Sequence, residues 1–192
     1  MKARTIREWL LAHALWLGVL WGFAEGTLFF IVPDVLITLI ALFSVRRSLW
    51  CLLAALAGAV AAGMLMYGLA TVYPEPVRAM VNGVPFVNDW MFDAVEQAYQ
   101  QSGALALALG PLAGIPFKLY AALAPEHLGL GWFIPLSILA RLERFFITWA
   151  AFALIGYALR HRADQYVGRI LLGHLGFWSA VCLYYWAVVV DG

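Results

Sequence analysis

Residues 110–118, with the sequence GPLAGIPFK, interrupt an apolar stretch that runs from residue 104 to residue 124. The segment holds four helix breakers, which are Gly110, Pro111, Gly114 and Pro116. Each break frees backbone donors and acceptors that lipid does not satisfy, so such a segment has to be shielded by protein or has to line a wet cavity. This pattern is typical of a hairpin that enters a membrane and leaves it on the same side.

The composition of the whole chain favours lipid as its solvent. Hydrophobic residues make up 65% of the 192 residues and charged residues only 12%, and the mean hydropathy is +0.86. Such a chain has too little polar surface to cover a water-soluble globule of this size. The formal net charge of +1 leaves no basic footprint for nucleic acid. Cys51 and Cys182 stand in apolar runs without metal-ligand spacing, so neither a metal site nor a cofactor is predicted.

Six apolar stretches follow one another along the chain. They are residues 9–24, 27–43, 49–73, 104–124, 132–159 and 170–190. A straight crossing takes about 20 residues, so the third, fifth and sixth stretches are long enough to span a membrane. The first stretch is short, and Pro33 with Asp34 breaks the second as residues 110–118 break the fourth.

Charged residues between the stretches predict the orientation. Basic residues mark three places, with Lys2, Arg4 and Arg7 at the start, Arg46 and Arg47 before the third stretch, and Arg160, Arg162 and Arg169 before the last. Lys and Arg are enriched in cytoplasmic loops, which places all three inside. Residues 74–103 carry Glu75, Asp89, Asp93 and Glu96 against a single basic residue, Arg78. We therefore expect this loop on the outer side.

The number of crossings between these loops then constrains each stretch. The third stretch runs outward and the fifth runs inward, so the fourth has to enter and leave on the outer side. The first two stretches together begin and end inside, which allows either a crossing hairpin or an interfacial first helix followed by an inner re-entrant loop. We favour the second alternative because the first stretch is short and carries Arg7, Glu8 and His13 near Trp9 and Trp16.

The predicted fold is a single all-α integral membrane domain that contains an inverted repeat. Its parts are an N-terminal interfacial or short membrane helix at 1–24, a first re-entrant hairpin plus spanning helix at 25–73, an acidic outer loop at 74–103, a second hairpin plus spanning helix at 104–159, and a last transmembrane helix at 167–190. Inverted repeats often hold a transport site near the midplane, where broken helices point their dipoles at a charged ligand. The expected location is a bacterial inner (plasma) membrane with a cytoplasmic N-terminus.

Six charged residues lie within or beside the apolar stretches, and they are Glu25, Asp34, Lys118, Arg141, Glu143 and Arg144. An unpaired charge at a helix centre costs about 2.5 to 3.5 kcal/mol on insertion scales, so these residues require one another or water. Arg141 and Arg144 share a helix face, which suits a phosphate or a pair of carboxylates. Asp34 and Lys118 follow the breaks of opposite halves and are candidates to face each other. The alternative is that the charges form neutral pairs that only fix helix docking.

Several passages of the sequence resemble the DedA family of membrane proteins, also called VTT or SNARE-associated Golgi proteins. They are EGTLFFIVPDVLITL at Glu25–Leu39, GAVAAGMLMYG at Gly58–Gly68, GIPFKLYAAL at Gly114–Leu123 and RLERFF at Arg141–Phe146. The resemblance covers residues 25–157. The chain departs from the family pattern in having one proline before Asp34, and Ala124 with Pro125 where the family usually has a glycine.

This resemblance implies two facing re-entrant loops and movement of lipids between leaflets, with polyprenyl phosphates or phospholipids as substrates. Glu25 and Asp34 match the acidic positions of the family, Arg141 and Arg144 its basic positions, and Lys118 a basic residue at the second hairpin. The residues predicted to bind substrate or ion are therefore Glu25, Asp34, Lys118, Arg141 and Arg144, and the hairpin breaks are Pro33, Pro111, Gly114 and Pro116.

Two functions from different classes remain open at this point. The leading hypothesis is a lipid transporter of flippase or scramblase type, in which the cations bind an anionic headgroup and Glu25 or Asp34 takes up a proton. The alternative is a membrane scaffold that docks a partner through Trp90 and Phe92 of the outer loop. An enzyme is disfavoured because no catalytic residue pattern is visible. The sequence does not specify whether the chain forms a homo-oligomer.

Overall fold

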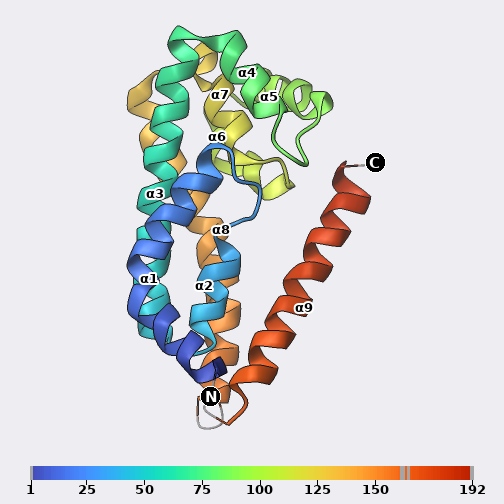
Figure 1. Cartoon of the computed structure of the whole chain (residues 1–192). Helices are drawn as coiled ribbons and strands as arrows, with labels where there is room; N and C mark the ends of the chain where they lie inside the picture. Colours follow the sequence, from blue (N-terminus) through green and yellow to red (C-terminus); the bar gives the residue numbers. More distant parts are fainter. Residues whose placement is uncertain (1, 161–162, 164, 191–192) are drawn as a thin grey trace.

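Two long helices that lie side by side and run in opposite directions, α3 (Val45–Val72) and α8 (Leu130–Leu159), form the axis of the molecule (Figure 1). At 1.5 Å per residue they are about 42 and 45 Å long. The computed structural model describes residues 2–160, 163 and 165–190, and every regular element among these residues is helical. Arg162, which contributed to the predicted orientation, lies outside the described residues.

The remaining elements surround this pair. They are α1 (Lys2–Thr27), α2 (Asp34–Ala41), α4 (Pro74–Asn82), α5 (Asp89–Ser102), α6 (Leu105–Leu109), the 3₁₀ turn η1 (Gly110–Ala113), α7 (Phe117–His127), α9 (Val167–Tyr185) and the π-helical turn η2 (Trp186–Val190). Helices α3 and α9, the latter counted as Val167–Val188, are by length and composition able to cross a membrane. We expected residues 132–159 to be a third such helix, but Arg141, Glu143 and Arg144 interrupt the apolar run of α8.

Helix α1 packs lengthwise against α3 through small residues. A Cβ atom on Gly22 would collide with the carbonyl oxygen of Ala55, and a Cβ atom on Gly58 would collide with that of Val19. Glycines at such a contact let two backbones approach closely, as they do in membrane helix pairs. Helix α1 extends to Thr27, three residues beyond the predicted end at residue 24. The interfacial helix and the short membrane helix both stay predictions for this segment.

Substitution of Gly58 tests this contact. We expect Gly58→Ala to lower the free energy of unfolding by about 1 to 3 kcal/mol, because the added methyl group has to push the α1 backbone away from α3. Gly68→Ala on the same helix is the matched control, since a Cβ atom there meets nothing within 4 Å. The measurement is the thermal unfolding midpoint in detergent. Equal midpoints for the two variants would contradict the close contact.

Two hairpins approach each other from opposite ends of the α3 and α8 pair (Figure 1). The first consists of the end of α1, a turn at residues 28–33, and α2, which begins directly after Pro33. The second consists of α6, η1 and α7. Its tip contains Gly114, which has a φ of +94° in the left-handed region that glycine adopts without strain. The Gly and Pro breaks thus end and restart the helices where the sequence predicted interruptions.

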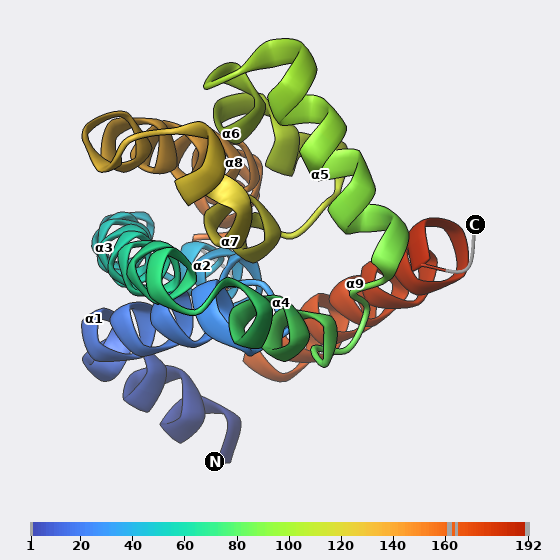
Figure 2. The ribbon, with the colours of Figure 1, turned by 90° about the horizontal axis from the view of Figure 1, so that it is seen from above.

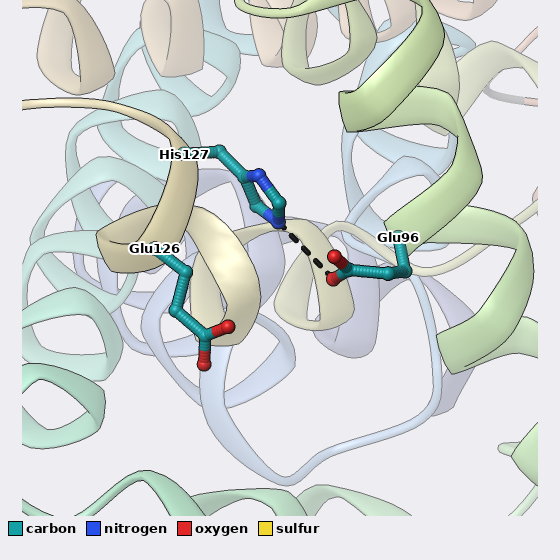
Figure 3. Close-up of side chains that lie close together, drawn as sticks. All are labelled: Glu96, Glu126 and His127. Atoms are coloured by element: carbon teal, nitrogen blue, oxygen red, sulfur yellow. Dashed lines mark hydrogen bonds and ion pairs between the residues drawn. The ribbon is translucent and has the colours of Figure 1, made fainter.

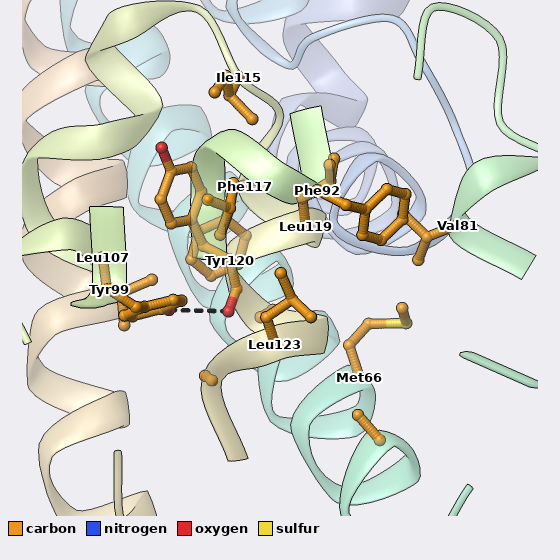
Figure 4. Close-up of a cluster of buried hydrophobic side chains, with 14 of the residues drawn as sticks. Met66, Val81, Phe92, Tyr99, Leu107, Ile115, Phe117, Leu119, Tyr120 and Leu123 are labelled. Carbon is orange, nitrogen blue, oxygen red and sulfur yellow. Dashed lines mark hydrogen bonds between the residues drawn. The ribbon is translucent and has the colours of Figure 1, made fainter. Parts of the chain in front are cut away.

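The segment at 74–103, expected as an acidic loop, folds into the two helices α4 and α5. Seen from above, these helices lie over the end of the bundle beside α7 (Figure 2). Apolar side chains of α4 and α5, including Val81 and Phe92, share a hydrophobic core with Leu119 and Leu123 of α7 (Figure 4). Phe92 is only 1% exposed. It is therefore not available to dock a partner, which corrects the role given to it in the scaffold hypothesis.

Polar contacts fix α9 to α2. Thr38 of α2 forms a hydrogen bond of 2.9 Å with Nε2 of His174, and Nε1 of Trp178 donates to the same hydroxyl at 3.0 Å. All three side chains are buried. Because a buried polar group without a partner is costly, this network favours one position of α9 against the bundle.

Removal of the Thr38 hydroxyl is expected to loosen α9. Thr38→Val keeps the shape but leaves Trp178 and His174 without their common partner, which should cost about 1 to 3 kcal/mol per group. Hydrogen–deuterium exchange of α9 amides should then accelerate, while Thr71→Val, at an exposed site on α3, should leave the exchange unchanged. Unchanged exchange in the Thr38 variant would show that the network does not hold the helix.

Candidate functional site

A cavity of about 420 Å³ lies where the tips of the two hairpins meet. Its lining comes from residues 25, 30–32 and 34 of the first hairpin, residues 111, 112, 114–116 and 118 of the second, the turn between α4 and α5, one face of α8, and the inner face of α9. Four of the lining side chains are charged, namely Glu25, Asp34, Lys118 and Arg144. Segments far apart in the sequence therefore bring four of the five predicted binding residues to one cavity.

Asp34 and Arg144 form an ion pair at the wall of this cavity. Nη2 of Arg144 lies 3.0 Å from Oδ2 of Asp34, and the hydroxyl of Thr148 donates to Oδ1 at 2.6 Å. Asp34 stands in the first turn of α2, where the helix dipole favours a carboxylate. Asp34 is almost fully buried, whereas about a fifth of the Arg144 side chain is exposed. Arg144 is therefore the partner that remains accessible from the cavity.

Glu25 and Arg141 form a second, fully buried ion pair. The guanidinium of Arg141 also lies over the ring of Phe117, 4.5 Å from its centroid, and 5.5 Å from that of Phe145. Its Nε and Nη1 atoms have no hydrogen-bond partner among the described residues. Arg141 does not line the cavity itself but lies behind Glu25, which does.

Lys118 is held by the first hairpin rather than by an acid. Its Nζ donates to the carbonyl oxygen of Phe29 at 2.7 Å, and the side chain is buried. Phe29 lies past the end of α1, where helix carbonyls lose their regular partners. We considered Lys118 and Asp34 as candidates to face each other; they line the same cavity, but Asp34 pairs with Arg144 instead.

The structure separates Glu143 from the other buried charges. Glu143 is not among the described residues that line the cavity, and it shares neither of the two ion pairs. In sequence the six charges cancel, but the five gathered around the cavity comprise three cations and two carboxylates. The cluster therefore carries a formal charge of +1, which favours an anionic ligand.

The predicted hairpin breaks surround the same cavity. Pro111, Gly114 and Pro116 line it, and Pro33 is buried directly before α2. The hydroxyl of Tyr185 on α9 donates to the carbonyl oxygen of Gly114 at 2.7 Å. This bond joins the end of α9 to the tip of the second hairpin, so α9 closes one side of the cavity.

Sequence reasoning missed three polar contributors to this site. Thr148 follows Arg144 by one helical turn, a spacing that places both on one face and would have indicated it. Trp178 and Tyr185 of α9 also line the cavity, but nothing in the apolar run of residues 170–190 distinguishes them from lipid-facing aromatic residues.

In comparisons with known proteins, no family model matches this sequence, and no curated protein or solved structure is significantly similar to it.

Proposed function

We propose that the chain is an integral membrane protein that moves lipids with anionic headgroups between leaflets, as the resemblance to the DedA family implies. The observation that carries the proposal is the cavity between the two hairpin tips, which combines a cluster of charge +1 with apolar walls. In such a site the charged headgroup of a lipid can contact the charged side chains, while its hydrocarbon tail contacts the apolar walls.

The exposed surface supports a lipid environment. Large apolar side chains are more than half exposed on four long helices, among them Trp16 and Leu20 of α1, Val72 of α3, Leu154 of α8, and Leu172 and Leu175 of α9. An apolar surface spread over several helices is costly in water and marks a membrane or a partner interface. Together with the apolar composition and the two helices long enough to span, it favours a membrane.

The headgroup would bind between Lys118 and Arg144. Lys118 uses one of its three donors on Phe29, which leaves two for a ligand. Arg144 contacts Asp34 through Nη2 and is the more exposed member of that pair. A guanidinium and an ammonium that line one cavity suit phosphate oxygens. Phe30, Ile147 and Val181 supply apolar wall for the lipid tail.

Proton uptake by Asp34 or Glu25 would gate this site. Protonation of Asp34 removes the charge that competes for Arg144, which frees the guanidinium for an anionic headgroup. Loss of the proton restores the ion pair and displaces the headgroup. The two hairpins, which approach from opposite ends, would act as the two halves of an inverted repeat around this fixed site. The basic residues near the N-terminus, before α3 and before α9 would orient the N-terminus toward the cytoplasm, in a bacterial inner membrane.

Reconstitution in liposomes tests the proposal. Wild-type protein should move a labelled anionic lipid between leaflets faster than protein-free vesicles do, and Arg144→Ala should lose most of that rate. If wild type moves neither a labelled polyprenyl phosphate nor a labelled anionic phospholipid faster than empty vesicles, the proposal is wrong.

A further inference from the structure

A second cluster of ligand-type side chains lies away from the cavity, where α5 meets the end of α7. Glu96 of α5 and His127 of α7 face each other, with Nε2 of the imidazole 3.1 Å from Oε2 of the carboxylate (Figure 3). Glu126 lies beside them, and one ligand atom from each of the three residues falls within 4.8 Å of the others. The His127 side chain is only 17% exposed.

We infer that Glu96, Glu126 and His127 bind a divalent metal ion, with zinc as the ion that their chemistry fits best. Imidazole nitrogen and carboxylate oxygen are both ligands that zinc takes, and three protein ligands leave a fourth position open for water. At metal–ligand lengths of about 2.1 Å, neighbouring ligands of a tetrahedral ion lie about 3.4 Å apart. The separation of Glu96 and His127 is already close to this, so the ion would replace their hydrogen bond.

The surroundings of the cluster orient the ligands. Gln100 Nε2 donates to Oε1 of Glu96 at 3.2 Å, which leaves Oε2 for the ion. The ring of Tyr99 stacks on His127, with centroids 4.7 Å apart and an angle of 14° between the planes. The Tyr99 hydroxyl donates to the Tyr120 carbonyl oxygen at 2.8 Å and is therefore directed away from the cluster. Tyr99 therefore positions the imidazole without competing as a ligand.

Two further features favour a cation here. His127 is the last residue of α7, and the unpaired carbonyl groups at a helix C-terminus carry partial negative charge. Glu126 is exposed, so its side chain is free to turn toward the ion. Bound zinc would join α5 to α7, the helix that carries Lys118 at its other end, and would thereby hold the second hairpin against the cap formed by α4 and α5.

Zinc titration of the purified full-length protein in detergent tests this site. Wild type should bind about one zinc ion per chain, and saturating zinc should raise its thermal unfolding midpoint by roughly 5 °C. His127→Gln and Glu96→Gln should each weaken zinc binding at least tenfold and remove the rise in midpoint. Glu75→Gln, an exposed glutamate of α4, is the matched control and should bind zinc as wild type does.

Unfolding midpoints measured in the presence of a chelator show whether the variants are folded without metal. Substitution of Co²⁺ for zinc gives an independent measurement, because a nitrogen ligand changes the visible absorption spectrum of bound Co²⁺. If His127→Gln and Glu96→Gln keep wild-type zinc affinity, or if wild type retains no zinc, the inference is overturned. Neither the zinc titration nor the Co²⁺ spectrum depends on lipid transport, so this inference can fail independently of the proposed function.

Discussion

Arg144→Gln should reduce lipid transport in liposomes at least tenfold while leaving the protein folded. The substitution keeps a side-chain donor within reach of Asp34 but removes the cation that we assign to the headgroup. A hydrogen bond to a charged group contributes about 1.5 to 3 kcal/mol, which corresponds to a loss of about 10- to 100-fold in affinity. The cluster of five charges would then be neutral and would no longer favour an anion.

Two companion variants sharpen this measurement. Arg144→Lys keeps the charge but loses the planar fork of donors, so it should retain an intermediate rate. Arg46→Ala removes an exposed arginine at the start of α3 and should transport as wild type does. Full transport by Arg144→Gln would show that this guanidinium only docks α8 against α2.

Glu25→Leu is expected to be the most destabilising single substitution at the site. It leaves the guanidinium of Arg141 buried without its carboxylate, and breaking a buried pair in this way costs about 3 to 5 kcal/mol. The double variant Glu25→Leu with Arg141→Met removes both charges and keeps an apolar side chain against Phe117. We expect it to recover most of the lost stability, as measured by the unfolding midpoint in detergent.

The same double variant separates the two roles of the pair. If Glu25 and Arg141 serve transport, the restored protein should remain inactive in liposomes. If they only fix helix docking, it should be both stable and active, and the pair would then have no part in transport. Ser137→Ala, a buried polar position on the same helix, serves as the control for changes in the α8 core.

The positions of the hairpin tips could be predicted from the glycine and proline residues alone. Glycine and proline restrict or free the backbone at their own positions, so Pro33 and the breakers at 110–116 mark the helix ends without knowledge of the fold. The small residues Gly18, Gly22 and Gly26 recur every fourth position and indicate a packed helix face. That pattern would have predicted a close helix contact for α1, but it does not identify α3 as the partner.

Residues 74–103 form the helices α4 and α5, although their acidic charges led us to predict a loop. Val77 and Val81, like Val95 and Tyr99, are four residues apart, and all four side chains are buried. This period is the signal of an amphipathic helix, but the charges of the segment were given more weight. The two helices of the cap, α4 and α5, could therefore have been predicted from the spacing of their apolar residues.

Which charges pair with one another was not predictable. Glu25 and Arg141 are 116 positions apart, and Asp34 and Arg144 are 110 apart. Two carboxylates and three cations allow several pairings of similar Coulomb energy. The packing of α2 against α8, and of α1 and α8 against α3, selects among them. The cluster of Glu96, Glu126 and His127 has the same origin, because α5 has to fold onto α7 before Glu96 reaches His127.

A structure of the protein determined in a lipidic mesophase that contains an anionic phospholipid tests the central claim most directly. We predict a phosphate group in the cavity, with oxygens about 3 Å from Nζ of Lys118 and from the guanidinium of Arg144. A structure in which these two side chains lie far apart in bulk solvent, with lipid headgroups only on the outer surface of the helices, would contradict the proposed site.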